Sequence, residues 1–250
     1  GARIGTSSLR RAAQLRHFRP DFEVVPLRGN LDTRIRKLDT ENLDAIVLAA
    51  AGVKRLGFDS RITEYINSSV MLPAIGQGAL CIESRCDDPL VKPLLIPLND
   101  PQTKKVVLCE RAFLDHLEGN CQIPIAAKGA VNNQNMSICG LVADIDGSNI
   151  VKDEVNGSIA SYRQLGKELA ERLLRMGGRE ILKKLFAMES QHYDRRGLAP
   201  VDFIRRHSDH PTTQLVDRYA GRNSPGVTNS DRPTSSNLLH TGYRHRLRIV

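Results

Sequence analysis

The sequence has no tryptophan, and aromatic residues make up only 4% of its 250 residues. Single-stranded nucleic acids bind by stacking their bases on aromatic side chains, so this scarcity argues against a base-stacking surface. No apolar stretch approaches the roughly 20 residues that a membrane-spanning helix needs, and no signal peptide precedes the first predicted domain. We therefore expect a cytoplasmic protein that binds neither nucleic acid nor a membrane.

Cysteine is sparse and scattered, at positions 81, 86, 109, 121 and 139. This odd set contains no CxxC pair and has no histidine cluster beside it, so it predicts neither a disulfide framework nor a zinc site, and no metal is expected. The sequence also lacks a GxGxxG after a predicted strand and a lysine after a glycine-rich loop. These absences argue against a dinucleotide or P-loop site.

The basic character of the chain is concentrated in its last quarter. Residues 187–250 hold ten arginines, no lysine and six acidic residues, and so contribute half of the formal net charge of +8. The positive total therefore says little about nucleic acid. The abrupt change in composition predicts a disordered tail over residues 187–250.

Arginines recur where predicted strands end. Residues 1–72 alternate short apolar runs with amphipathic stretches, which indicates βαβ units around a parallel sheet. Ligands of such sheets lie beyond the carboxyl ends of the strands, and helix N-termini favour anions. The pattern predicts one cleft for carboxylates or phosphates. The three junctions are GTSSLRR (residues 5–11), LRGN (27–30) with Thr33 and Arg34 after it, and LAAAG (48–52) followed by Arg55.

The remaining chain is expected to form a connection and a second domain. Residues 73–98 are rich in glycine and proline, which indicates a connection and a remnant of the first domain. Residues 101–186 predict a small α+β domain: a helix over 104–117, a strand near 128–131, a hairpin turned at Asp146 and Gly147, and two helices separated by Gly177 and Gly178.

Cys121 has the most informative setting among the cysteines. It lies in EGNCQIPI (residues 118–125), after a predicted helix stop and before Pro124. A cysteine is usually a small buried hydrophobe, but this position predicts a thiol presented on a loop. We expect that loop to lie over the arginine cleft.

Together these motifs resemble the porphobilinogen deaminase family, also called hydroxymethylbilane synthase. The resemblance rests on the three arginine junctions, on GQGAL (residues 76–80), and on ERAFL (110–114) leading to EGNC (118–121). It covers residues 3 to about 186, corresponds to the C-terminal two-thirds of the family, and leaves the tail unmatched. It implies part of a doubly wound α/β domain like those of periplasmic binding proteins, followed by a small α+β domain.

The resemblance implies a transferase of haem and chlorophyll biosynthesis. Family members polymerise four porphobilinogen units into hydroxymethylbilane with release of ammonia, and are typically monomers. A dipyrromethane cofactor is joined by a thioether to the cysteine that matches Cys121. The residues implied in binding the carboxylates of the cofactor and growing chain are Arg10, Arg11, Arg28, Arg34 and Arg55, with Ser8 and Thr6 assisting. Arg36 lies outside the motifs and is expected on the surface.

The resemblance also implies where the catalytic carboxylate belongs. In the family the catalytic aspartate lies upstream of the segment that matches Gly1, so no residue of this chain is expected to replace it. We therefore expect the chain as given to be inactive in turnover. A non-catalytic carboxylate-binding or anion-binding module, making no bond to Cys121, is the alternative that the residues leave open.

Overall fold

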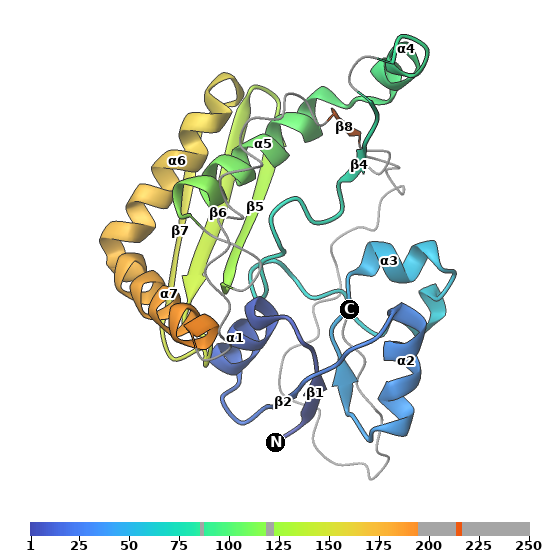
Figure 1. Cartoon of the computed structure of the whole chain (residues 1–250), viewed down its shortest axis with the longest axis vertical. Helices are drawn as coiled ribbons and strands as arrows, with labels where there is room; N and C mark the ends of the chain where they lie inside the picture. The colour runs from blue at the N-terminus through green and yellow to red at the C-terminus, as the bar shows by residue number, and fades with distance from the viewer. Residues whose placement is uncertain (86–87, 119–122, 195–213, 217–250) are drawn as a thin grey trace, which may run out of the picture.

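The computed structural model describes residues 1–85, 88–118, 123–194 and 214–216 (Figure 1). These residues form a mixed α/β structure with a parallel and an antiparallel three-stranded sheet, which confirms the predicted mixed α/β class. The finer likeness to periplasmic binding proteins stays a prediction. Within the described residues, no helix combines the length and the apolar character needed to cross a membrane.

The first unit is a small parallel sheet with helices on both faces. Strands β1 (Arg3–Gly5), β2 (Glu23–Val25) and β3 (Ala45–Ile46) lie in the order β2-β1-β3. Helix α1 (Leu9–Phe18) packs on one face through Leu15. Helices α2 (Leu31–Thr40) and α3 (Ala50–Arg55) pack on the other. Because neighbouring residues of a strand face opposite ways, Ala45 joins the first core and Ile46 the second.

The second unit is an antiparallel sheet covered by helices. Strands β5 (Ile125–Asn132), β6 (Asn135–Ala143) and β7 (Ile150–Ser158) lie in that order, and their largest core also contains α5 (Pro101–His116) and α6 (Tyr162–Leu173). A π-helical turn (Leu174–Gly178), with Gly177 at a φ of 112°, leads into α7 (Arg179–Asp194). Helix α7 thus runs beyond the predicted start of the tail at residue 187. The Lys-to-Arg change there does not alter helix propensity, because both are good helix formers.

Helix α1 lies between the two sheets, as Figure 1 shows. The face of the antiparallel sheet opposite α5 and α6 forms a small apolar cluster with Ala13 of α1 and with Leu72. In β6 the side chains alternate, so that Ile138 faces α5 and α6 whereas Leu141 faces α1. One helix is therefore shared by the hydrophobic cores of both units.

The segment between the units is mostly irregular. It contains the 3₁₀ turns η1 (Asp59–Arg61) and η2 (Ile96–Leu98), the strand β4 (Leu80–Ile82) and the short helix α4 (Val91–Leu95). Strand β4 pairs antiparallel with β8 (Gln214–Val216). The other residues of the predicted tail after Asp194 lie outside the described part of the chain.

Candidate functional site

The loop between β1 and α1 is shaped by its own hydroxyl groups. Ser8 is the N-cap of α1, and its Oγ accepts a hydrogen bond from the backbone N–H of Arg11 at 3.4 Å. The Thr6 side chain is buried, and its Oγ1 accepts from the Ser8 N–H at 3.2 Å. Both predicted site hydroxyls therefore define the path of the backbone at the start of α1.

Side chains of this loop connect the carboxyl ends of all three parallel strands. The Oγ of Ser7 donates to the Leu27 carbonyl after β2 and accepts from the Leu27 N–H, both at 2.9 Å. Arg11 Nη1 donates to the carbonyl of Val47, directly after β3, at 2.9 Å. The loop after β1 is thus tied to the ends of β2 and β3, and the three sequence junctions lie together.

Arg10 points towards the segment that leaves the first unit. Its Nη1 donates to the Leu72 carbonyl at 2.8 Å, and its Nη2 donates to Gln77 Oε1 at 3.3 Å. Gln14, one turn further along α1, supports the same place: its Nε2 donates to the Leu72 carbonyl and its Oε1 accepts from the Leu72 N–H. The Arg10 side chain is therefore held by two acceptors on one short segment.

Three arginines form a cluster of like charge around the α1 N-terminus. Burial, followed by the neighbouring charge of Arg11, lowers the pKa of Arg10 to about 10. Burial and the charge of Arg34 lower the pKa of Arg11. Both guanidinium groups stay protonated at neutral pH, so the cluster favours a bound anion that offsets desolvation and mutual repulsion.

Arg34 is oriented by the turn that precedes α2. Its Nε donates to the Gly29 carbonyl at 2.8 Å, and Asn30 caps α2 by accepting from the Thr33 N–H at 2.8 Å. Gly29 has a φ of 123°, and a Cβ there would come within 2.7 Å of Thr33 Cγ2. Gly29 and Asn30 thus fix the backbone conformation at the start of α2, and the Gly29 carbonyl in turn orients the Arg34 side chain.

The structure places the other predicted arginines on the surface. Arg28 is exposed after the end of β2, and Arg55 is exposed as the last residue of α3. Arg36 of α2 is exposed, as expected. Asp44 lies at the amino-terminal ends of the parallel strands, directly before β3, where its carboxylate accepts from the Arg3 N–H at 2.8 Å. This aspartate is therefore remote in the sheet from the arginine cluster.

A cavity of about 560 Å³ opens next to Gln77. It lies between α3, the segment after Leu72, α5 and the middle of β5. Lys54 contributes a cation whose Nζ stands 5.0 Å from the centre of the Tyr65 ring. The polar side chains of its wall are Lys54, Tyr65, Gln77, Gln102, Thr103 and Glu110. Gln77, which lines the cavity, also accepts the hydrogen bond from Arg10 Nη2.

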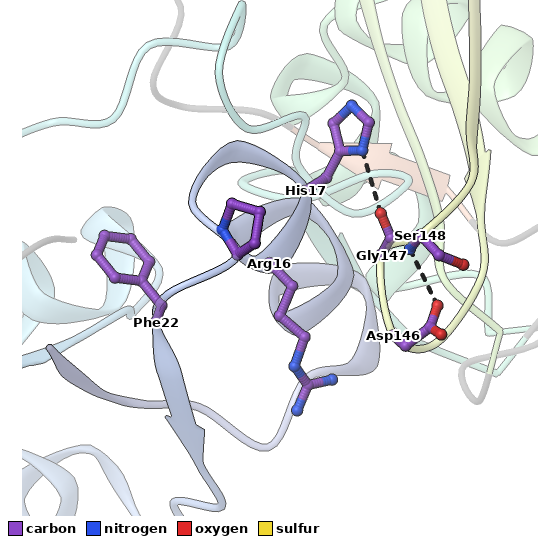
Figure 2. Close-up of a pocket in the computed structure, with 7 residues that line it drawn as sticks. Arg16, His17, Phe22, Asp146, Gly147 and Ser148 are labelled. Carbon is purple, nitrogen blue, oxygen red and sulfur yellow. Dashed lines mark hydrogen bonds between the residues drawn. The ribbon is translucent and has the colours of Figure 1, made fainter. Parts of the chain in front are cut away.

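A smaller pocket of about 300 Å³ marks the contact between α1 and the β6–β7 turn (Figure 2). His17 Nδ1 and the Gly147 carbonyl oxygen are 3.1 Å apart, and Arg16 Nη1 donates to the Ile145 carbonyl at 3.1 Å. Gly147 has a φ of 76°, and a Cβ there would overlap the Ala13 carbonyl. The polar groups of this pocket therefore hold the C-terminal end of α1 against the second unit.

The described cysteines differ in burial. Burial raises the pKa of the Cys109 thiol to about 12, and burial also raises the pKa of Cys139. Cys81 is exposed on β4. Cys86 and the predicted attachment residue Cys121 lie outside the described residues. Because the thiolate is the nucleophile, Cys109 and Cys139 are poor candidates for covalent chemistry.

The sequence motifs did not indicate a role for three polar side chains that form hydrogen bonds to or within residues 72–77: Gln14, Gln77 and Glu110. Their shared signal is a polar residue inside an apolar or glycine-rich pattern. Glu110 lies three residues from both Val107 and Phe113 on the buried face of α5, and Gln14 lies among the buried residues of α1. A polar group that keeps such a place needs a buried partner, which only the tertiary structure identifies.

The fold defines a two-unit α/β protein with a parallel-sheet unit and an antiparallel-sheet unit, and Arg10, Arg11 and Arg34 form a cationic cluster at the start of α1. No group of three metal-ligating side chains occurs in the described parts of the chain. Residues 1–93 match the family model for the dipyrromethane cofactor binding domain of porphobilinogen deaminase, and residues 104–175 match the model for its C-terminal domain. Together the two models cover more than half of the chain, which therefore belongs to the porphobilinogen deaminase family.

Individual relatives agree with this membership. The chain is 52% identical over 189 residues to porphobilinogen deaminase of Pelobacter propionicus, covering 76% of this chain and 61% of that protein. It is 50% identical over 192 residues to that of Trichlorobacter lovleyi, covering 77% and 62%. For Geobacter metallireducens the identity is 50% over 189 residues, covering 76% and 59%. The chain thus spans about three fifths of the length of these relatives.

Proposed function

We propose that this chain serves tetrapyrrole biosynthesis as a hydroxymethylbilane synthase, a transferase that joins four porphobilinogen units and releases ammonia at each step. The observation that carries the proposal is the cluster of half-buried arginines at the start of α1, made by Arg10, Arg11 and Arg34. It lies within the residues that match the cofactor-binding domain of the family. Each pyrrole of the substrate and cofactor brings an acetate and a propionate group, which need cationic partners.

The donor chemistry of the cluster fits such a ligand. A guanidinium has five N–H donors in a planar fork and pairs with carboxylates through two parallel hydrogen bonds. Arg10 uses one donor on each of Nη1 and Nη2 for protein acceptors, and Arg11 uses one donor of Nη1. These bonds orient both groups and leave further donors for a carboxylate. Arg28 and Arg55 are exposed and belong to the same sequence motifs, and we propose that they bind later carboxylates of the growing chain.

Other residues of the site hold the arginines rather than the ligand. The hydroxyls of Thr6 and Ser8 shape the start of α1, where free backbone N–H groups and the positive helix end add to the attraction for an anion. When bound, dipyrromethane supplies the pyrrole carbon on which the chain is extended.

We propose Cys121 as the residue that carries dipyrromethane through a thioether. Cys121 itself lies outside the described residues, and support comes from both sides of it. Leu117 and Ile123 are buried in the core of the second unit, so the chain is anchored before and after the cysteine. Among the described cysteines, Cys109 and Cys139 have pKa values raised by burial. That leaves their thiols poorly suited to attachment.

Intact-mass spectrometry tests the attachment. The purified chain is compared with Cys121→Ser and with Cys81→Ser, a control that removes the exposed cysteine of β4. We expect a dipyrromethane increment in the parent and in Cys81→Ser and none in Cys121→Ser. An increment that persists in Cys121→Ser contradicts the assignment. Binding of porphobilinogen without any increment in the parent would instead favour a non-catalytic carboxylate-binding module.

A further inference from the structure

Glu110 is a buried carboxylate that joins the two units. Its side chain is only 6% exposed, on the face of α5 that packs against β5. Oε2 accepts a hydrogen bond from the backbone N–H of Gly76 at 2.7 Å, and Oε1 accepts from the N–H of Gly129 at 2.8 Å. One donor belongs to the segment that leaves the first unit, whereas the other belongs to the sheet of the second.

The hydrogen bond from Gly129 attaches the Glu110 carboxylate to the sheet of the second unit. Strand β5 lies at the edge of its sheet, so N–H groups on its outer side need acceptors from elsewhere. Gly129 also allows α5 to approach closely, because a Cβ there would come within 2.9 Å of Val106 Cγ1. The carboxylate is thus seated between a helix and a strand that belong to one hydrophobic core.

The Gly76 contact fixes a turn that carries Gln77. Gly76 has a φ of 67°, and the turn is closed by hydrogen bonds from Gln77 N to the Ala74 carbonyl and from Ala79 N to the Gly76 carbonyl. Gln77 Oε1 accepts from both the Ala74 N–H and Arg10 Nη2, each at 3.3 Å. The orientation of Gln77, and with it one contact of Arg10, depends on where this turn is held.

We propose that Glu110 is a positioning residue of the carboxylate site. It anchors the turn at residues 74–79 to the antiparallel sheet, and Gln77 of that turn orients the Arg10 guanidinium. The inference rests on the proposed function only in taking Arg10 as a carboxylate-binding residue. The continuous path is Gly129, Glu110, Gly76, Gln77 and Arg10, made of three hydrogen bonds and the peptide bond between Gly76 and Gln77.

A carboxylate suits this role better than its neutral isostere. Both atoms that face Glu110 are N–H donors, and an ionised carboxylate offers only acceptors. Glutamine would turn an NH₂ group towards one of the two donors, leaving a buried N–H without an acceptor. Burial raises the pKa of Glu110, whereas the two backbone hydrogen bonds and the charge of Lys128 act in the opposite direction. Lys128, on β5, also donates to Ser68 Oγ at 3.1 Å.

Hydrogen–deuterium exchange of the full chain tests the anchoring without any ligand. In Glu110→Gln we expect the amides of residues 74–79 to exchange at least about tenfold faster, because a turn released from its anchor opens more often. Exchange in β6 and β7 should stay the same. The matched control is Asp115→Asn, which removes an exposed carboxylate from the same helix and should leave residues 74–79 unchanged. Unchanged exchange of residues 74–79 in Glu110→Gln overturns the proposal.

A double-mutant cycle tests whether the anchor acts through Gln77. Isothermal titration with porphobilinogen is carried out on the parent, Glu110→Gln, Gln77→Ala and the double variant. We expect each single change to raise Kd about tenfold, and the double variant to resemble the singles, because both interrupt one path. Fully additive losses overturn the path. Gln77 is exposed, so the Gln77→Ala variant is expected to fold. If Glu110→Gln does not fold, Gln77→Ala still tests whether Gln77 contributes to binding.

The two arms separate this inference from the proposed function. If the parent does not bind porphobilinogen, the proposed function fails, and the exchange measurement still decides whether Glu110 anchors the turn. If the parent binds and Glu110→Gln binds equally well, the positioning role fails while the proposed function stands.

Discussion

At the scale of single residues, the arginines of the site differ in what they do for the fold. Arg10 and Arg11 donate to backbone carbonyls of segments distant in sequence, at Leu72 and Val47. Arg34 donates to a carbonyl only five residues away, and Arg28 and Arg55 are exposed. Burial of Arg10 and Arg11 lowers their pKa values, and keeping them charged costs free energy in the folded state. Groups with pKa values shifted in this way concentrate at functional sites.

Replacing Arg10 by leucine should weaken ligand binding more than stability. In Arg10→Leu the Leu72 carbonyl still accepts a hydrogen bond from Gln14 Nε2, so it is not left without a donor. We expect the free energy of unfolding to change by less than about 1 kcal/mol. Losing a charge-assisted hydrogen bond costs about 1.5–3 kcal/mol, which corresponds to roughly a 10- to 150-fold rise in the Kd for porphobilinogen.

Titration calorimetry and chemical denaturation measure the two quantities. Arg36→Leu is the matched control, because Arg36 is exposed on α2 and lies outside the arginine motifs. It should leave both Kd and stability near the parent values. A collapse of stability in Arg10→Leu with unchanged binding would show that Arg10 is a structural residue.

At the scale of elements, close packing of α5 and α6 depends on one glycine. A Cβ at Gly166 would overlap the Cys109 carbonyl and come within 2.9 Å of the Phe113 backbone N. The obstacles are helix backbone atoms, which cannot move aside as the end of a flexible side chain can. Gly52 in α3 has an open environment, with no atom within 4 Å of an added Cβ. A side chain at Gly166 would therefore collide with α5, whereas a side chain at Gly52 would meet no neighbouring atom.

Alanine substitution at these two glycines should have opposite effects on stability. Gly166→Ala should lower the free energy of unfolding by about 1–3 kcal/mol, because overpacking forces α5 and α6 apart. Gly52→Ala should raise it by about 0.5–1 kcal/mol, because alanine has the higher helix propensity. Urea denaturation of the two variants beside the parent measures both changes. A neutral Gly166→Ala would mean that α6 can shift on α5 without loss of packing.

These elements also show how far sequence patterns reach. The α5 helix, the hairpin with its turn at Gly147 and the break at Gly177 follow from local apolar periodicity and glycine chemistry, and the structure confirms each. The change in composition at residue 187 predicts a disordered tail, but α7 extends to Asp194 because the residues after 187 still favour a helix. The packing of α1 on the second sheet was also missed, since its partners lie over one hundred residues away.

At the scale of the whole molecule, the two units are joined by contacts on both sides of α1. The β6–β7 turn contacts the end of α1 at His17, while Lys152 donates to the Ser69 carbonyl at 3.1 Å. Glu110 adds the contact to Gly76. Arg10 and Arg11 of the arginine cluster therefore lie on a helix whose position both units determine, which couples site geometry to the docking of the units.

Because it joins the units, Glu110 should also make their stability depend on pH. Burial raises its folded-state pKa above the usual 4.5. Its contribution to stability is then full below the unfolded pKa and is lost as the pH rises through the folded value. We expect the free energy of unfolding of the parent, relative to Glu110→Gln, to decrease as the pH rises from about 4 towards neutrality.

Denaturation of the parent and Glu110→Gln across this pH range provides the measurement. The Asp115→Asn variant serves as the control for the loss of one carboxylate from α5, and no comparable pH-dependent difference from the parent is expected. A difference that grows with rising pH would mean that the hydrogen bonds from Gly76 and Gly129, rather than burial, dominate the folded-state pKa of Glu110.

Local sequence determined the mixed α/β class, the three arginine junctions and the family, because strand ends, helix caps and short motifs depend on residues near one another in the chain. Only the tertiary structure decided which arginines cluster, that Gln14 and Gln77 hold the segment near Arg10, and that Glu110 joins the two units. These contacts join residues 34 to 67 positions apart, and no local periodicity encodes them. Burial then sets the arginine pKa values, since desolvation is a property of the packed molecule.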